Sequence, residues 1–239
     1  MTYAKAFFGL QLEFAEAVSG LSGLPLARAV LDYTNLYIRV GLGRDFEPNH
    51  PTWQDYAAGL LGAHDRADFT YSFYLARPET VVPPGVVATF GCFSSALLSA
   101  DRIRLHFRNV ENAGQSALAM QHRDRRLVDL AELFAHVKYS LRGPVRVVGA
   151  SWLYNIVAYR RLFPEAYLAT ARVIQARFRH MPLWGQFLDR HGNVRENMAL
   201  AFRKRLHQQS SVLGLDGCFS FQVLSLEAPA LEFYDFYGV

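Results

Sequence analysis

The segment RIRLHFRN, residues 102–109, has the residue types and spacing that point most directly to chemistry. Basic and apolar side chains alternate along it, the basic ones being Arg102, Arg104, His106 and Arg108. Alternate side chains of a β-strand point to opposite faces of a sheet, so one face should carry all four basic groups. Guanidinium groups bind phosphate and carboxylate through paired, charge-assisted hydrogen bonds. The pattern predicts an anion site held by Arg104 and Arg108, or else a solvated face whose arginines pair with acids of neighbouring strands.

Three side chains are candidates for acid–base catalysis. His106 lies within the basic row, and an unperturbed imidazole has a pKa of about 6.5. Asp189 is an alternative base at the start of the turn DRHGNV, where aspartate is also common for local reasons. Tyr237, in the C-terminal segment EFYDFYGV, is the candidate proton donor, unless these rings only clamp the chain end onto the core.

A second group of candidates lies at the corner GASWLYN, residues 149–155, where a buried strand gives way to a helix. Ser151, Trp152 and Asn155 are its candidate ligand-binding residues. GASWL partly matches the nucleophile elbow G-x-S-x-G, which would make Ser151 the nucleophile of a hydrolase, but Leu153 replaces the second glycine. The alternative is local: Ser151 satisfies backbone groups, Trp152 packs, and Asn155 caps the helix.

The segment LWGQFLD places Trp184 and Gln186 on one face of an expected strand, where they would form the wall of a ligand site. A structural role for this pair is the alternative. The histidines show no HExxH pattern or paired-ligand spacing, so the sequence predicts no metal site. The glycines form neither a GxGxxG fingerprint nor a P-loop.

These residues need a scaffold, and hydrophobic periodicity predicts an α+β fold with a mixed β-sheet flanked by helices. Helices are expected over 3–18, 25–40 and 52–63, which gives a helical N-terminal region, 1–80. The prolines within 77–85 mark a domain boundary. The domain 85–239 should follow the order β-β-α-β-α-β-β-α-β, with strands over 86–98, 101–110, 145–148, 169–180, 183–189 and 217–228 and helices over 125–140, after Asn155 and over 195–209.

Composition excludes several classes of protein. Of 239 residues, 51% are apolar and 19% charged, which argues against disorder. The net charge of +4 comes without a Lys/Arg run, so no nucleic-acid partner is predicted. Two distant cysteines indicate neither a disulfide framework nor a structural zinc site. No segment of eighteen apolar residues predicts a membrane span, and no signal peptide is recognisable, so we expect a cytoplasmic protein.

The segments GASWLYNIVAYRRLFPEAYLATARVIQARF and LWGQFLDRHG resemble the GNAT-like C-terminal domain of uncharacterised bacterial proteins that carry a helical, acyltransferase-type N-terminal domain. The similarity covers roughly residues 100–190 and lies in element order: an LHF-type strand, a helix, a corner strand, and two further strands. It implies a GNAT-like sheet and a donor of the CoA or acyl-CoA type. The family's pyrophosphate loop, Q/R-x-x-G-x-G/A, does not occur in this chain.

Two functions follow as alternatives. In the first, the chain is an acyltransferase-like protein in which Arg104 and Arg108 hold the anionic donor, His106 or Asp189 is the base, and Tyr237 protonates the leaving group. In the second, the same basic face makes a non-catalytic binding module for a small anionic metabolite or a partner protein. A Ser151 hydrolase ranks last, and the oligomeric state is left open.

Overall fold

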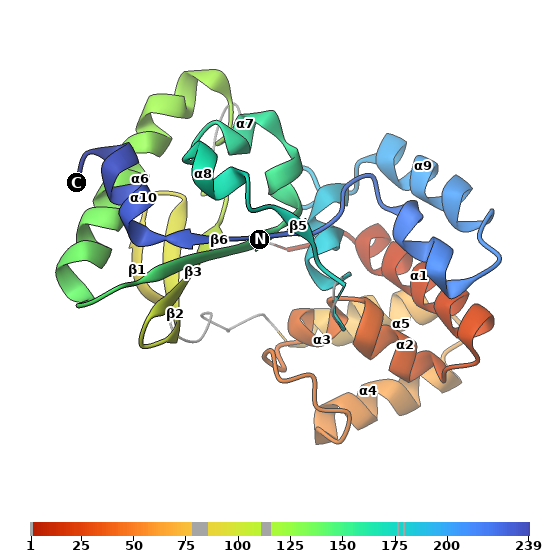
Figure 1. Ribbon diagram of the computed structural model, residues 1–239. Coiled ribbons are helices and arrows are strands. Elements are labelled where there is room, and N and C mark those ends of the chain that lie inside the picture. The colour runs from red at the N-terminus through yellow and green to blue at the C-terminus, as the bar shows by residue number, and fades with distance from the viewer. Residues whose placement is uncertain (1, 78–85, 111–115, 176, 179) are drawn as a thin grey trace. The chain divides into compact units, whose positions relative to one another are not determined.

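The computed structural model describes residues 2–77, 86–110, 116–175, 177–178 and 180–239. The chain forms two compact units (Figure 1). Unit 1 comprises Met1–Val81 and Gln175–Gln222, and unit 2 comprises Val82–Ile174 and Val223–Val239. This division differs from the predicted one, because the segment 175–222, expected in the second domain, packs with the N-terminal helices instead. The proline segment predicted as the boundary falls mostly on 78–85, outside the described residues.

Unit 1 is helical, as predicted for the N-terminal region. Its α-helices are α1 (Lys5–Ser22), α2 (Leu26–Tyr33), α3 (Leu36–Arg39), α4 (Pro51–Gly62), α5 (Arg66–Leu75) and α9 (Glu196–Leu206). Two 3₁₀ helices complete it, η3 (Met181–Phe187) and η4 (Val212–Cys218). α5 is an element that the sequence reasoning did not predict; its N-cap is Asp65, whose side chain accepts from the amide of Asp68.

The core of unit 1 is built around α1 and is rich in aromatic rings. α1 packs against α2, α5, α9 and η4, and most of its circumference is buried. Phe14, at its centre, is fully buried and makes edge contacts with Trp184 and Phe219. No single described helix is long and apolar enough to cross a membrane; α1 and α2 pass that test only as a pair, bent by 119°.

Unit 2 is an α+β domain, as predicted. Its described strands form one mixed sheet in the order β1-β2-β3-β4-β6-β5. The strands are β1 (Val86–Phe90), β2 (Phe93–Ser99), β3 (Arg102–Phe107), β4 (Arg146–Ser151), β5 (Arg172–Val173) and β6 (Leu224–Pro229). β3 and β4 are parallel, and the other neighbouring pairs are antiparallel. The predicted hairpin between the second and third strands is present.

The helices of unit 2 share one hydrophobic core with one face of the sheet (Figure 1). They are η1 (Met120–His122), α6 (Arg123–Ser140), η2 (Trp152–Asn155), α7 (Val157–Arg160), α8 (Glu165–Leu168) and α10 (Ala230–Tyr237). Leu130 and Phe134 of α6 and Phe233 of α10 pack there with Ile103 and Val147 of the strands. The C-terminal aromatic segment therefore packs onto the core, with Phe233 stacked on Phe134 at 4.5 Å between ring centroids.

Two strand predictions are wrong. The segment 183–189 forms most of η3, because Leu183, Trp184 and Phe187 follow helical spacing and are all buried on the same side. Pro182, which cannot donate to a strand ladder, suits the first turn of this helix. Of the expected strand 169–180, only β5 forms. The expected strand 86–98 is divided by a turn at Gly91, whose φ of 51° lies in the left-handed region.

Candidate functional site

The two parallel strands, β3 and β4, are hydrogen-bonded to each other over their first residues and not at their carboxyl ends. β3 and β4 pair only from Arg102 to Arg104 and from Arg146 to Val148. Beyond these residues, β3 stays paired with β2 and β4 with β6, and the described residues give no further pairing between β3 and β4. Open sheets of this kind bind ligands outside the carboxyl ends of such strands. We call the chain at this end, from Arg104 to Arg108 and from Ser151 to Asn155, the carboxyl edge.

The carboxyl edge unites candidates that lie more than forty positions apart in the sequence. His106 and Arg108 reach it from β3, and Ser151, Trp152 and Asn155 reach it from β4. A parallel connection requires the crossover helix to run back along the sheet, so α6 also begins at this end (Figure 1). The amino terminus of a helix carries a partial positive charge, which α6 presents on the core face of the sheet, opposite to the face of Arg104 and His106.

Local hydrogen bonds hold the corner after β4. Ser151 Oγ accepts from the amide of Leu153 at 3.1 Å, and Asn155 Nδ2 donates to the Trp152 carbonyl at 2.8 Å. Asn155 thus closes the short turn η2 and does not cap α7, because no side-chain cap is formed there. Ser151 thus satisfies a backbone amide, which is the local role predicted for it, whereas Asn155 holds the turn and not the helix start.

The alternation predicted for β3 is present. Ile103 and Leu105 are buried in the core, whereas Arg102 is exposed and Arg104 and His106 are half-buried on the opposite face. We call this opposite face of the sheet the basic face. The strand register places Arg146 of β4 beside Arg102 of β3. Arg172 of β5 pairs with Ser225 of β6, and Ser225 pairs on its other side with Ala150 of β4.

Glu227 of β6 neutralises part of the basic face. Its carboxylate accepts from Arg146 Nε at 2.5 Å and from an Arg102 guanidinium nitrogen at 2.8 Å. The hydrogen bond from Arg146 and the nearby charge of Arg102 hold the pKa of Glu227 below its usual range. Arg102 is therefore on the solvated face and paired with an acid, although that acid lies on β6, beyond β4, and not on a strand next to β3.

Arg104 lies in a different environment. Its strand neighbours in register are Ala96 of β2 and Val148 of β4, neither of which can accept a side-chain hydrogen bond. Its Nε is buried and has no hydrogen-bond partner among the described residues. A buried donor without an acceptor costs about 1–3 kcal/mol, which a ligand oxygen would relieve. Arg104 is therefore the arginine of this face best prepared to receive an anion.

A cluster of tyrosine hydroxyls lies on the helix side of the same strand end. Gly149 is the first residue of β4 beyond its pairing with β3, and the Tyr154 and Tyr167 hydroxyls occupy the space where its Cβ would be. These two hydroxyls are 2.8 Å apart. Burial raises the pKa values of Tyr154, Tyr159 and Tyr167, so all three hydroxyls stay protonated. The sequence reasoning missed this cluster, although the tyrosines lie within or just after the corner segment.

The three predicted acid–base residues have different local environments. Tyr237 donates to the Leu162 carbonyl at 2.6 Å, and burial raises its pKa well above the ordinary value. Asp189 belongs to unit 1, where its Oδ1 accepts from the amides of His191 and Asn193 at 2.7 and 2.9 Å. These turn hydrogen bonds, opposed by desolvation, lower its pKa. Both groups are engaged locally, and His106 is the predicted acid–base residue that lies at the carboxyl edge.

Trp184 and Gln186, predicted as a ligand wall, are fully buried in unit 1. Trp184 Nε1 donates to the Tyr33 carbonyl at 3.2 Å, and Gln186 donates to Leu183 and accepts from the amide of Phe221. Their polar atoms satisfy the backbone around them. Among the described residues, no group of three or more His, Cys, Asp or Glu side chains is placed to hold a metal ion.

Two buried polar groups were not anticipated from the sequence. In unit 2, Arg126 Nε of α6 pairs with Asp129 at 2.9 Å, and its guanidinium contacts Cys92 Sγ at the turn between β1 and β2. In unit 1, His180 is 2% exposed and its Nε2 lies 2.6 Å from an Asp216 oxygen. An Arg at i and an Asp at i+3 on the apolar side of the expected helix 125–140 was the available signal for the first pair.

Comparison of the chain with protein-family models, with curated proteins and with solved structures finds no significant match.

Proposed function

We propose that unit 2 binds an anionic donor of the CoA type at the carboxyl edge and acts as an acyltransferase-like protein. The observation that carries this proposal is the separation of β3 and β4 immediately after Arg104, whose buried Nε lacks an acceptor among the described residues. An elongated phosphate-bearing ligand would place an anionic group on Arg104 and Arg108.

The first three elements of the resemblance support the same proposal. The strand that contains LHF, the helix after it and the corner strand occur in the order that the GNAT-like resemblance implies, and the two strands lie side by side in one mixed sheet. Of the two further strands that it implies, only β5 forms, and 183–189 belongs to η3. His106 is the base of this proposal, since it lies beside Arg104 and Arg108 on the same strand end. It would accept the proton of the acyl acceptor as that group attacks the donor.

The test is calorimetric titration of the purified full chain with CoA and with acetyl-CoA. We expect Arg104→Ala and Arg108→Ala each to weaken binding at least tenfold. Arg142→Ala, an exposed arginine in the connection between α6 and β4, is the control and should bind like the parent. A folded parent chain that binds neither compound would overturn the proposal.

A binding module for an anionic metabolite is the second candidate, and one observation favours it. Tyr237 and Asp189, the other predicted acid–base residues, are already engaged in local hydrogen bonds. Release of free CoA thiol from acetyl-CoA, measured with a panel of amines, separates the two functions. Release that is lost in His106→Gln with binding retained supports the acyltransferase; binding without release in every case supports the module.

A further inference from the structure

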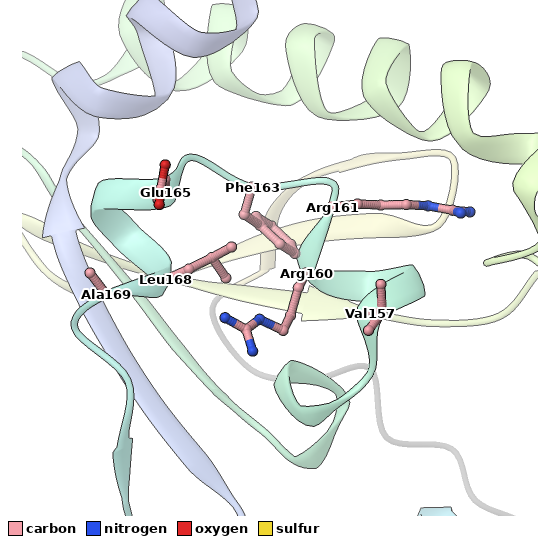
Figure 2. A pocket seen from close by; sticks show the side chains of 7 residues that line it. All are labelled: Val157, Arg160, Arg161, Phe163, Glu165, Leu168 and Ala169. Carbon is pink, nitrogen blue, oxygen red and sulfur yellow. The ribbon is translucent and has the colours of Figure 1, made fainter.

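A pocket of about 500 Å³ is lined by residues of α7, of α8 and of the segment that joins them (Figure 2). Val157 and Arg160 of α7 line it on one side, and Leu168 of α8 and the following Ala169 line it on the other. None of these residues belongs to the carboxyl edge or to the basic face. The volume falls in the range that accommodates small organic ligands.

The pocket combines an apolar lining with unequal charge. Val157 is 79% exposed, and Leu168 is half-buried, so both present apolar surface to a ligand. Arg160 and Arg161 contribute two guanidinium groups, and Glu165 contributes one carboxylate. Figure 2 shows the side chains of Arg160 and Glu165 directed to opposite sides of the segment. The Arg160 guanidinium has no ion pair or hydrogen bond with the described residues, so its charge is available.

Arg161 forms a fixed part of the lining. Its guanidinium donates to the Leu118 carbonyl at 2.9 Å and contacts Met120 Sδ at 2.9 Å, which holds the side chain against the segment before α6. Its Nε is buried and has no hydrogen-bond partner among the described residues. In this pocket, Arg161 is therefore held in place by the protein, whereas all the N–H donors of the Arg160 guanidinium can bind a ligand.

We propose that this pocket binds a monocarboxylate with an apolar body. The carboxylate would accept paired hydrogen bonds from Arg160, and the hydrocarbon part would lie over Val157, Leu168 and Ala169. The net positive lining selects the acid over its neutral amide. The ligand class follows from this lining alone, and the site does not depend on CoA binding at the carboxyl edge.

The experiment compares octanoate with octanamide, which has the same hydrocarbon body without the charge, by calorimetric titration of the full chain. We expect octanoate to bind at least tenfold more tightly. Arg160→Gln should abolish that preference, whereas Arg142→Gln, a matched exposed arginine, should keep it. Ala169→Phe should weaken both compounds, because the ring would occupy the pocket while all charges remain.

Two further arms keep this test separate from the proposed function. Glu165→Gln should tighten octanoate binding, because it removes the one acidic group of the lining. Saturating CoA should leave octanoate binding unchanged, and Arg104→Ala should do the same. Equal affinity for acid and amide, or an Arg160→Gln chain that retains the preference, would overturn the proposal. Octanoate binding lost in Arg104→Ala would do so too, by moving the site to the basic face.

Discussion

Replacing Gly149 with alanine should disturb unit 2 far more than its small size suggests. A Cβ at this position would lie well under 3.0 Å from the hydroxyls of Tyr154 and Tyr167, which are hydrogen-bonded to each other in the core. Overpacking a core by a methyl group costs about 1–3 kcal/mol. Separating the two hydroxyls leaves a buried polar group unsatisfied, which costs a further ~1–3 kcal/mol.

A small opposing effect reduces the total. Alanine restricts the unfolded chain more than glycine does, which stabilises by about 0.4–1 kcal/mol where the native conformation allows it. We therefore expect Gly149→Ala to lower the free energy of unfolding by about 1–5 kcal/mol. Removing the Tyr167 hydroxyl takes away one of the two hydroxyls that the methyl group would overlap, so that only Tyr154 still has to move. The double variant Gly149→Ala/Tyr167→Phe should then be more stable than the sum of its single changes by at least ~1 kcal/mol.

The assay is urea unfolding of the full chain combined with hydrogen exchange of the peptides that contain β4 and β6. The exchange data confine the effect to unit 2, and the α1 peptide serves as the internal reference for unit 1. Gly62→Ala is the matched control, because no atom lies within 4 Å of its added Cβ. The reasoning would be refuted if the changes in unfolding free energy of the two single variants added up to that of the double variant. It would also be refuted if the Gly149→Ala chain were as stable as the Gly62→Ala chain.

Three other outcomes follow from the buried and charged groups. Arg126→Leu should cost about 3–5 kcal/mol by leaving Asp129 buried without its cation, and Arg126→Leu/Asp129→Leu should recover most of it in the same urea assay. The pKa of Glu227 is lower in the folded chain than in the unfolded chain, so the ionised carboxylate stabilises the fold above pH ~4.5. This stabilisation is lost as the pH falls through the folded pKa. Glu227→Gln should therefore flatten the dependence of the unfolding free energy on pH between about pH 5 and 3. Burial raises the pKa of the Cys218 thiol to about 11, so at pH 8 only about one thiol in 1,000 is ionised, and a maleimide should label it only on unfolding. Labelling of native Cys218 within minutes would contradict this.

Local patterns predicted the fold class and the elements with strong periodicity. The alternation along β3 was readable because one face meets the core at Ile103 and Leu105 while the other stays polar. η3 was misread because Trp and Phe are frequent in strands, and only the tertiary contacts of Trp184 with Phe14 and Phe202 show that a helical turn buries them. Propensity was overridden there by packing.

The candidate site was readable only in part, because its partners come from distant segments. The acids that neutralise a basic strand cannot be assigned from that strand alone: Glu227 lies 125 positions from Arg102. The importance of Gly149 follows from two hydroxyls that the fold brings to one point, and no local rule places them there. The sequence alone indicated the residue types of the carboxyl edge, whereas only the fold shows that these residues lie next to each other.

The interleaving of the two units has a consequence for the order in which the chain can fold as it is synthesised. Ile174 and Val223 are hydrogen-bonded neighbours at 3.0 Å, so residues 175–222 leave unit 2 and return to it at one point. A nascent chain ending at residue 222 holds every segment of unit 1 but lacks β6, which pairs with both β4 and β5. The carboxyl edge therefore acquires its finished sheet only when residues 223–239 have left the ribosome. A chain that stops prematurely near residue 222 would contain all segments of the helical unit 1 but an incomplete sheet in unit 2. We expect proteases of the cell to degrade such a chain, because its unpaired strands are exposed.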